Sequence, residues 1–475
     1  MQDIYDIIVI GAGAGGLNIA VFMNTVGCRV LLIDKSDTSI GGDCLNYGCV
    51  PSKALIHAAR TVAAGKQATQ YGVTQEGVVD MEKVMAHVNG ARETIREHEN
   101  AEHFRGMGID VVLGHATFRS KDAVSVAGKE YTSKKIVIAT GSRSRTLDIP
   151  GIKEATDAGV IHTNETIFNL KTLPKKLVVI GAGPIGVELG QAFRQLGSEV
   201  SMVTNDAQIL AREDKAMSEV LLGQLLEDGV ALHFKKEVLR IEDGHLIVRD
   251  AEGSEETALP FDALLVSIGR VLNVDTLGLG NAGINTDDCG KIILDQYLRT
   301  SNPRVFVCGD AAGQHQFTHA AELHAGVILR NFFVPFFKKK LNTDHMSWVT
   351  YTTPEIATFG LSEAVLKERN ISYRVLEESF VHDDRAITEG ATSGRVKLLV
   401  HPKKGTLFGG SMVARGAGEL VQELILAMSS GLRVSALFNK TYPYPAATRI
   451  NKRVISGYFK DKLTPFAKTV MRKLY

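Results

Sequence analysis

Short, almost uninterrupted apolar runs recur along the chain and end in small or polar residues. The run from Ile4 to Ile10 leads directly into a glycine-rich loop, and a second run from Val30 to Ile33 ends in Asp34. Such runs are typical of strands in a parallel sheet that is covered on both faces. A strand, a glycine loop, a helix and a following acid form the dinucleotide fingerprint, in which backbone N–H groups approach a pyrophosphate and the acid binds a ribose hydroxyl. Its members are Gly11, Gly13, Gly15, Gly16 and Asp34.

The same order of strand, loop and helix occurs a second time. An apolar run at 177–180 precedes another glycine fingerprint, and a further run follows at 200–203. Two fingerprints in one chain indicate two bound dinucleotides. The second ribose position holds Thr204 and Asn205 and has no carboxylate. Arg212, a few residues further on, could bind a 2′-phosphate or could be an ordinary surface residue. The pattern favours NADPH as the nucleotide, and NADH is the alternative. The second fingerprint contains Gly181, Gly183 and Gly186.

Two cysteines follow the first fingerprint closely. Cys44 and Cys49 flank Gly48, a residue that permits a tight backbone and disulfide distance between the sulfurs. Pro51 suits the first turn of a helix, which would place Cys49 at the positive helix end, where a thiolate is stabilised. A structural disulfide or half of a metal site are the alternatives, but a redox-active pair is favoured, with FAD at the first fingerprint and a nicotinamide at the second. The other cysteines, Cys28, Cys289 and Cys308, are scattered singly.

Further apolar runs end in turns or acids. The run 135–138 leads into Thr140 and Gly141, and the run 264–268 into Gly269. The run 305–307 leads to Asp310, which would lie at the strand end where ligands of open α/β sheets bind. From Trp348 onward the pattern predicts an α+β domain without a nucleotide loop. Its predicted strands and helix are 349–359, 396–400, 407–413 and 418–429.

Composition narrows the class of protein. At 475 residues, with 44% hydrophobic and 23% charged residues, the chain should form several domains of an ordinary globular protein. The formal net charge of +1 gives no reason to expect a nucleic acid or an anionic membrane as a partner. No run is long enough to span a membrane, and the expected location is the cytoplasm. The segment Phe332–Phe337, which precedes three lysines, is expected to be a buried helix end followed by a solvated turn rather than a surface anchor.

With these motifs in place, the sequence resembles the FAD-dependent pyridine nucleotide-disulfide oxidoreductases, the family of lipoamide dehydrogenase, glutathione reductase and mercuric reductase. The resemblance covers nearly the whole chain, and the stretch GGDCLNYGCVPSK at 41–53 is its most specific part. It implies a homodimer in which NAD(P)H reduces FAD, FAD reduces the disulfide, and the dithiol reduces a substrate at the subunit interface. Cys49 would be the thiolate against the flavin and Cys44 the interchange thiol, while Lys53 would approach the flavin and pair with Glu188. The family's nucleotide motifs match Gly42, Thr140, Gly141, Gly269, Thr300 and Asp310.

The expected fold is therefore α/β, with two Rossmann-like nucleotide-binding domains and a C-terminal α+β dimerisation domain. Residues 1–149 and 270–347 would form the FAD domain, 150–269 the NAD(P)H domain and 348–475 the interface domain.

One departure from the family lies near the C-terminus. Disulfide reductases of the family carry His-Pro-Thr-x-x-Glu, whose histidine serves substrate thiols as acid and base. Here Tyr444 stands at the histidine position and Arg449 at the glutamate position. Tyrosine, with a reference pKa of about 10, is a poor base at neutral pH, and arginine is none. Mercuric reductases are similar in carrying a tyrosine there, although this chain lacks their terminal cysteine pair and N-terminal metal-binding domain.

The predicted protein is an enzyme that passes electrons from NADPH or NADH through FAD and the Cys44–Cys49 pair to a metal ion, a quinone or a small electrophile, with Tyr444 at the substrate. No resident metal site is expected. A lipoamide dehydrogenase or a low-molecular-weight disulfide reductase is the first alternative. The second comes from another class, a nucleotide-binding redox sensor or scaffold with little turnover.

Overall fold

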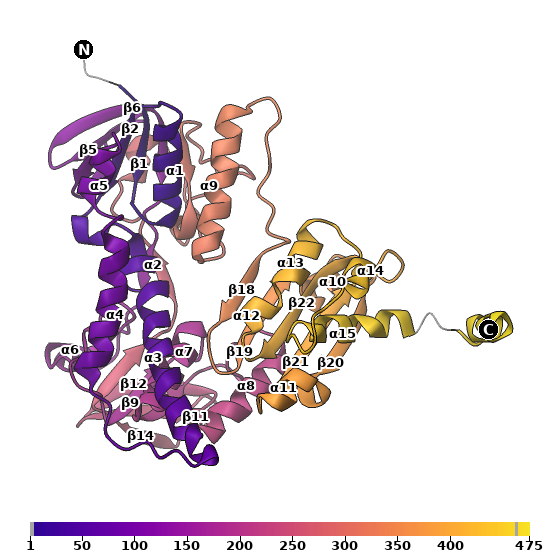
Figure 1. The fold of residues 1–475 in the computed structure, drawn as a ribbon. Coiled ribbons are helices and arrows are strands. Elements are labelled where there is room, and N and C mark those ends of the chain that lie inside the picture. The colour runs from indigo at the N-terminus through magenta and orange to yellow at the C-terminus, as the bar shows by residue number, and fades with distance from the viewer. Residues whose placement is uncertain (1–3, 461–463) are drawn as a thin grey trace. The chain divides into compact units, whose positions relative to one another are not determined.

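We describe residues 4–460 and 464–475 in a computed structural model of the chain, which divides into two units (Figure 1). The first unit consists of Met1–Gly181, Gln195–Ser198 and Val238–Leu341. The second consists of Ala182–Arg194, Glu199–Glu237 and Asn342–Tyr475. Each unit combines helices with sheets, which confirms the predicted α/β class.

A parallel sheet with β1 at its centre forms the core of the first unit. Ile7 of β1 lies opposite Val30 of β2, and Ile7 and Val9 belong to one apolar cluster while Ile8 and Ile10 belong to another. Both faces of the sheet are therefore buried, which is why the runs contain no polar alternation. The order is β3-β2-β1-β6, with β17 also paired to β6. The parallel strands are β1 (Tyr5–Ile10), β2 (Val30–Asp34), β3 (Asp110–Leu113), the end of β6 (Lys129–Ile138) and β17 (Val305–Val307).

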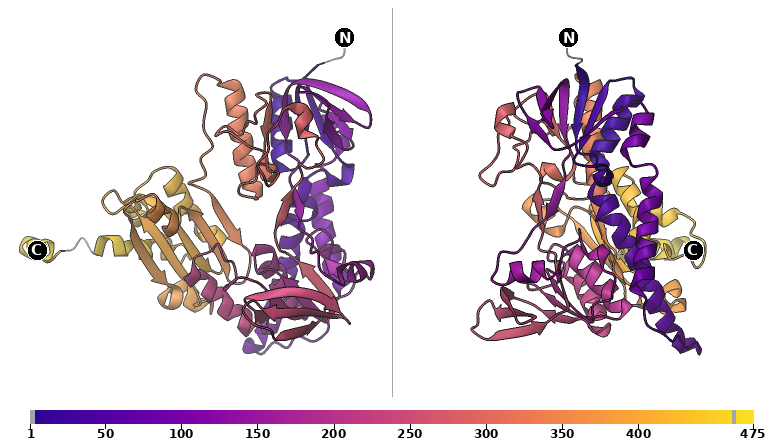
Figure 2. Two further views of the ribbon diagram at one scale, coloured as in Figure 1. Left: turned by 180° about the vertical axis from the view of Figure 1, so that it is seen from behind. Right: turned by 90° about the vertical axis from the view of Figure 1, so that its left-hand side faces the viewer.

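Helices cover this sheet and carry the cysteine pair. α1 and α9 pack side by side (Figure 2), and α3 packs along α4. The helices of the first unit are α1 (Ala14–Thr25), α2 (Gly42–Asn46), α3 (Cys49–Gln67), α4 (Met81–Arg96), α5 (Ala101–Gly106), α6 (Ile152–Asp157) and α9 (Thr318–Phe333). Two short antiparallel strands, β4 (Ala116–Phe118) and β5 (Ala123–Val126), continue from the start of β6.

The second fingerprint joins β9 (Lys176–Ile180) to α7 (Pro184–Leu196). In the first unit β15 (Ala263–Val266) pairs in parallel with β9 and with β8 (Ile161–His162). In the second unit β10 (Glu199–Val203) pairs in parallel with β11 (Ala231–His233), and α8 (Lys215–Glu227) lies between them in sequence. The other strands up to residue 272, which lie in the first unit except for the start of β12, are β7 (Ser142–Ser144), β12 (Lys236–Glu242), β13 (His245–Asp250), β14 (Glu256–Pro260) and β16 (Arg270–Leu272).

The C-terminal part of the second unit is an antiparallel sheet with helices packed on it, as the predicted α+β pattern requires. Its strand order is β18-β19-β22-β21-β20. The strands are β18 (Ser347–Thr350), β19 (Glu355–Gly360), β20 (Arg374–Ser379), β21 (Arg395–Val400) and β22 (Leu407–Ala414). The helices are α10 (Glu363–Glu368), α11 (Asp384–Thr388), α12 (Ala417–Leu420), α13 (Gln422–Ser429), α14 (Val434–Asn439), α15 (Arg449–Lys460) and α16 (Pro465–Leu474).

Two local expectations were wrong. The single strand expected at 349–359 is two strands, β18 and β19, because Pro354 lacks the N–H that a continuous ladder needs and the chain turns back there. The buried helix end expected at Phe332–Phe337 is only partly buried, since Phe336 is 92% and Phe337 78% exposed. Both residues lie beyond Phe333, where α9 ends, so they are outside the helix that packs against α1.

Every helix within residues 4–460 and 464–475 is too short or too polar to cross a membrane.

Candidate active site

The two predicted redox cysteines lie on consecutive helices of the first unit. Cys44 is on the short helix α2, and Cys49 is the first residue of α3. A Cβ on Gly48 would lie 2.9 Å from the carbonyl oxygen of Asp43, so the close approach of the chain to α2 requires glycine here. Both thiols are free. The tight link between α2 and α3 therefore keeps Cys44 of α2 close to the start of α3, where Cys49 lies.

The two sulfurs have opposite acid strengths. A hydrogen bond from the Cys44 thiol is the main cause that lowers the pKa of Cys49 to about 6, and the Thr318 hydroxyl, 3.5 Å from the Cys49 sulfur, and the charge of Lys53 act in the same direction. Burial around the sulfur opposes this shift, although Cys49 as a whole residue is exposed. The same hydrogen bond, burial and repulsion by the Cys49 thiolate raise the pKa of Cys44. At neutral pH the reduced pair holds a thiolate at Cys49 and a thiol at Cys44.

This difference predicts a low pH midpoint for alkylation of the reduced protein. Because the pKa of Cys49 is lowered to about 6, its thiolate should persist from neutral pH down to about pH 6 and disappear below it. We expect the rate of iodoacetamide labelling of Cys49, followed by mass spectrometry, to rise with a midpoint near 6. Thr318→Val should move the midpoint upward, since it removes one hydrogen bond to the thiolate. A midpoint near the ordinary cysteine value of about 8.5 would contradict the geometry.

The first fingerprint forms a loop without room for side chains. A Cβ on Gly11 would lie 2.3 Å from the carbonyl oxygen of Ala139, and one on Gly16 would lie 1.9 Å from the carbonyl oxygen of Gly11. α1 then begins at Ala14, with no side-chain cap from Gly13 and no acid in its first turn. The first backbone N–H groups of α1 are therefore left for an anion, as the pyrophosphate of FAD requires.

The cysteine helix begins against this loop. Gly42, with a φ of 62°, approaches so closely that a Cβ there would lie 2.7 Å from the Cα of Gly13. Gly15 faces the sulfur of Cys308. Cys308 is buried and is therefore a packing residue of the core. The structure thus brings the nucleotide loop and the start of α2 together within the first unit.

Asp34 and Thr140 border the same loop. The Asp34 carboxylate accepts hydrogen bonds from the backbone N–H of Ala12 at 2.6 Å, from the backbone N–H of Lys35 at 2.7 Å and from the Ser39 hydroxyl. A carboxylate offers about four acceptor positions, so one is left for a ribose hydroxyl. The Thr140 hydroxyl is buried and has no partner among the described residues. Since such a group costs about 1–3 kcal/mol unless it is satisfied, it fits a position where FAD supplies the partner.

Arg270 joins the cysteine helix to the second FAD motif. Its guanidinium is 3.0 Å from the carboxylate of Asp43 and 3.8 Å from that of Asp310. It also donates to the Ser142 hydroxyl at 2.6 Å, and that hydroxyl donates to Asp310 at 2.5 Å. Burial raises the pKa of Asp310, while Ser142 and Arg270 oppose the rise. Asn164 donates to Asp43 at 3.3 Å, so the residue before Cys44 is held from two sides.

Removal of this arginine should destabilise the first unit. Arg270→Ala leaves the carboxylates of Asp43 and Asp310 close together without their cation, and because Asp43 is 35% exposed, solvent limits the cost to about 1–3 kcal/mol. We expect urea unfolding to show a loss of this order. The matched control is Arg143→Ala, since Arg143 makes an exposed ion pair with Asp275 at 2.9 Å and should cost less than about 1 kcal/mol. If both variants lose the same free energy of unfolding, the contacts of Arg270 stabilise the protein no more than an exposed ion pair does.

The second fingerprint has the same close packing at its first glycine. Gly181, with a φ of 100°, would place a Cβ 2.5 Å from the carbonyl oxygen of Ser267, while nothing lies within 4 Å of such an atom at Gly183. Glu188 on α7 is buried and accepts the backbone N–H of Tyr351 at 2.8 Å. Gly186 is buried, Gly269 has a φ of 108° and Arg212 is exposed. The pairing of Lys53 with Glu188 and the contact of Arg212 with a phosphate stay predictions.

Tyr444 is an exposed residue next to a permanent positive charge. Its side chain is 69% exposed, and the Arg449 guanidinium lies over its ring, 5.3 Å from the ring centre. Arg449 also donates to the carbonyl oxygen of Tyr442, whose own hydroxyl donates to Glu423 at 2.9 Å. Burial and this carboxylate raise the pKa of Tyr442. The segment 441–449 contains no histidine or carboxylate, the side chains that most often serve as a general base.

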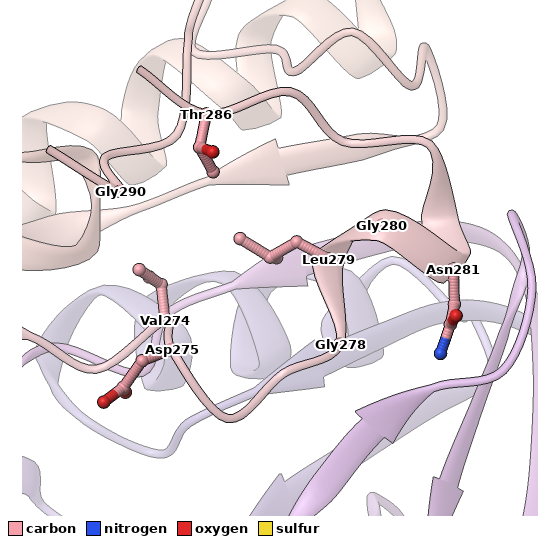
Figure 3. Close-up of a pocket in the computed structure, with 8 residues that line it drawn as sticks. All are labelled: Val274, Asp275, Gly278, Leu279, Gly280, Asn281, Thr286 and Gly290. Carbon is pink, nitrogen blue, oxygen red and sulfur yellow. The ribbon is translucent and has the colours of Figure 1, made fainter. Parts of the chain in front are cut away.

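A shallow hollow of about 340 Å³ lies elsewhere in the first unit (Figure 3). None of the predicted site residues lines it, and its Asp275 and Asn281 are already bonded to Arg143 and to the carbonyl oxygen of Phe118. We assign it no ligand. Within the described ranges 4–460 and 464–475, no cluster of three or more His, Cys, Asp or Glu side chains is arranged to hold a metal ion.

Sequence reasoning missed Thr318, Arg270, Ser142 and the role of Asp43. Thr318 begins α9, and a hydroxyl at a helix start soon after Asp310 was a usable signal. Arg270 and Ser142 come together because β7 and β16 pair antiparallel, with Arg270 opposite Ser144 and Leu272 opposite Ser142. That pairing joins segments far apart in sequence and leaves no local mark.

Two nucleotide loops and a dithiol pair that begins against the first of them define a nucleotide-dependent dithiol oxidoreductase. Comparison with known proteins supports this class. Residues 5–325 match the family described as pyridine nucleotide-disulphide oxidoreductase, and residues 346–453 match its dimerisation domain. The chain belongs to this family and is a FAD-dependent NAD(P)H oxidoreductase, so the resemblance found in the sequence is confirmed.

Its relatives fall into more than one branch of the family. A dihydrolipoyl dehydrogenase of Mycoplasma pneumoniae is 31% identical over 96% of this chain and 100% of its own length. A mercuric reductase of Staphylococcus aureus is 30% identical over 93% of this chain and 80% of its own. Among solved structures, the HOCl-induced flavoprotein disulfide reductase RclA from Escherichia coli is 27% identical, with a TM-score of 0.84 over 95% of this chain and 99% of that chain. A Cu(II) complex of RclA is 26% identical, with a TM-score of 0.83 over 96% and 99%.

Proposed function

We propose that the protein passes electrons from NADPH through FAD and the Cys44–Cys49 pair to a soft metal ion, with a quinone or another small electrophile as acceptors of the same kind. The proposal rests mainly on Tyr444, which stands where disulfide reductases have a histidine base. Tyr444 is exposed to solvent, and the Arg449 guanidinium lies over one face of its ring. A disulfide substrate needs that base, because the attacking thiol must lose its proton. A metal ion does not need it, because coordination itself deprotonates a thiol.

The roles of the chain's own residues follow from their surroundings. FAD, when bound, supplies the two-electron relay between the nicotinamide and the cysteine pair. The reduced pair then offers the Cys49 thiolate, held by Thr318, and the Cys44 thiol. Oxidation of this pair by a divalent ion forms one S–S bond, releases the Cys44 proton to solvent and transfers two electrons, either to one ion or to two ions that each take one. Thiolate sulfur is a soft ligand that selects ions such as Cu(I), the product of Cu(II) reduction.

The relatives support this choice without deciding it. Mercuric reductases are among the similar proteins, and the structural relative RclA is known as a Cu(II) complex. Dihydrolipoyl dehydrogenases of equal similarity keep the first alternative open. For those enzymes' chemistry, however, Tyr444 and Arg449 are the wrong residues, since neither accepts a proton at neutral pH.

The test is anaerobic. The FAD-loaded protein is reduced with NADPH, and Cu(II), Hg(II), a quinone, lipoamide and glutathione disulfide are then added separately while flavin reoxidation is followed by absorbance. We expect fast reoxidation with a metal ion or the quinone and slow reoxidation with both disulfides. Fast reoxidation with a disulfide would favour a lipoamide dehydrogenase or a low-molecular-weight disulfide reductase. If NADPH does not bleach the flavin, the redox sensor or scaffold becomes the better proposal.

The preference for NADPH rests on Arg212. It is exposed and follows a ribose position without a carboxylate, which suits the 2′-phosphate. We expect Arg212→Ala to raise the KM for NADPH by about tenfold, as the loss of one charge-assisted contact implies, and to leave the KM for NADH unchanged. Steady-state kinetics with both nucleotides measure this difference. An equal change for both nucleotides would mean that Arg212 does not contact the phosphate.

The proposal includes a homodimer formed through the C-terminal domain, in the cytoplasm. The match to the family's dimerisation domain supports the dimer. A reducing compartment suits an enzyme whose working form is a dithiol.

A further inference from the structure

α16 carries an apolar face that no part of the described chain covers. Phe466, Val470 and Leu474 follow one another at a spacing of four residues, which places them on one side of the helix. Phe466 is 78% and Leu474 82% exposed, and Met471 beside them is exposed too. The hydrogen bonds described for residues 465–475 stay within the helix and the residue before it. Apolar side chains are therefore exposed from the first turn of α16 to its last.

The preceding helix, α15, is amphipathic too, but its apolar face is buried against the antiparallel sheet. The apolar side chains of α15, among them Ile450, Val454 and Ile455, are almost completely buried in the core of the domain. Both helices are amphipathic, so the difference lies in what they pack against. The apolar face of α15 is used by the fold, and that of α16 is available to something outside the described chain.

α16 is basic and contains no Asp or Glu. Because residues on a helix advance by about 100° each, Lys468 and Arg472 lie on the side opposite Phe466, Val470 and Leu474, while Lys473 flanks the apolar face beside Phe466. Aromatic and aliphatic side chains on one face and lysine or arginine on the other are the composition of helices that lie in the surface of a bilayer.

A second segment, in the first unit, repeats this composition in a loop. Phe336 and Phe337 are exposed at the turn after α9, and Lys338, Lys339 and Lys340 follow them directly. The turn is not loose, because the buried Asn331 side chain donates to the carbonyl oxygen of Lys339 at 2.9 Å and accepts its N–H at 2.7 Å. The two phenylalanines are thus held outward by a fixed loop base.

We propose that the protein binds the surface of an anionic lipid bilayer through α16, which lies in the lipid interface, and that the Phe336–Phe337 loop of the other unit is a lipid contact in its own right. The charge of the two segments favours lipid over a protein partner. Residues 336–340 and α16 together contain six Lys or Arg and no Asp or Glu, although the whole chain has a net charge of only +1. Each basic residue near an anionic surface strengthens binding by roughly fivefold, and this attraction adds to the apolar area that α16 buries in the interface. Surface binding would also bring the enzyme to lipid-soluble acceptors of the quinone class.

The test uses the full-length, FAD-loaded protein in vesicle flotation. Vesicles of pure phosphatidylcholine are compared with vesicles that also contain phosphatidylglycerol, at low and at high salt. We expect flotation with the anionic vesicles only, and its loss at high salt because the Debye length falls to about 3 Å at 1 M. Equal flotation with both lipids, or none with either, overturns the proposal.

Variants separate the two contacts. Phe466→Ser with Leu474→Ser should weaken binding at least about tenfold, since two large apolar side chains no longer enter the interface. Phe336→Ser with Phe337→Ser should weaken it by a smaller factor. Tyr71→Ser is the matched control, because Tyr71 is 78% exposed but has no lysine cluster beside it, and it should change nothing. If the serine variants instead change the oligomeric state by analytical ultracentrifugation without lipid, a second copy covers these faces and the proposal fails.

The proposal stands apart from the choice of electron acceptor. Reduction of the flavin by NADPH should be unchanged in all of these variants, because none of the substituted residues belongs to the predicted active site. A protein that floats but reduces no acceptor would refute the proposed function alone.

Discussion

Replacement of Cys44 by serine should stop electron transfer to the acceptor and leave reduction of the flavin intact. The Cys44 sulfur is the partner in the S–S bond, so without it the chain has no dithiol to oxidise. We expect turnover with a metal ion or a disulfide to fall by about 10³-fold or more, as losses of an essential nucleophile do. Stopped-flow absorbance would show NADPH bleaching the flavin at an undiminished rate, followed by no return on addition of the acceptor.

The Cys49 thiolate should survive in the Cys44→Ser variant. A serine hydroxyl can donate the hydrogen bond that is the main cause of the lowered pKa of Cys49, and Thr318 and Lys53 are unchanged. Alkylation of Cys49 should therefore keep a low pH midpoint. Cys289→Ser is the control, since Cys289 is another free and exposed cysteine, far from α2 in sequence, and should have no effect. Unchanged turnover in Cys44→Ser would refute the assigned order of the two cysteines.

The strands and the nucleotide loops were predictable because their physical causes are local. The run at Ile7–Ile10 is apolar since both faces of β1 are covered, and Gly11 and Gly16 are glycines since their neighbours leave no room for a Cβ. Cys44 and Cys49 were found for a similar reason, as a pair with a glycine between them at a helix start. Each of these causes acts within a few residues and is visible in the sequence.

The contacts that surround the cysteines were not predictable, because they depend on distant segments. Thr318 meets Cys49 across 269 residues, and Ser142 meets Asp310 across 168. Arg270 follows the predicted turn at Gly269 and has no local mark of its role, although it is almost buried between Asp43 and Asp310. Phe336 was expected at a buried helix end, but α9 stops at Phe333 and the structure exposes Phe336 beyond it.

Gly48 has two reasons to be a glycine, and the sequence indicates only one of them. Its φ of −116° and ψ of −115° lie outside the helical and extended regions that other residues adopt, in keeping with the tight backbone expected beside the cysteines. A Cβ at this position would also violate the contact with Asp43. That lack of space depends on the neighbouring chain and leaves no mark in the sequence.

A histidine at position 444 should restore activity on disulfides if a missing base is the limit. Tyr444→His introduces a group with a pKa near 6.5, and general acid–base help is typically worth 10²- to 10⁴-fold. The full gain is not expected from this change alone, because the Arg449 guanidinium lies 5.3 Å from the centre of the Tyr444 ring and would disfavour a second positive charge. We expect about a tenfold rise in kcat/KM for lipoamide from the single variant.

The double variant Tyr444→His with Arg449→Glu should do better, for two reasons. A carboxylate in place of the guanidinium would orient the imidazole and stabilise its protonated form. Arg449 is also the first residue of α15, where the helix dipole disfavours a cation and favours an acid by about 0.3–1 kcal/mol. We expect kcat/KM for lipoamide to rise by about 10²-fold or more over the parent protein, with no gain for Cu(II). Tyr444→Phe is the control and should leave the slow disulfide rate where it is. If the double variant gains nothing on disulfides, the base is not what separates this protein from the disulfide reductases, and the argument for a metal acceptor from Tyr444 fails with it.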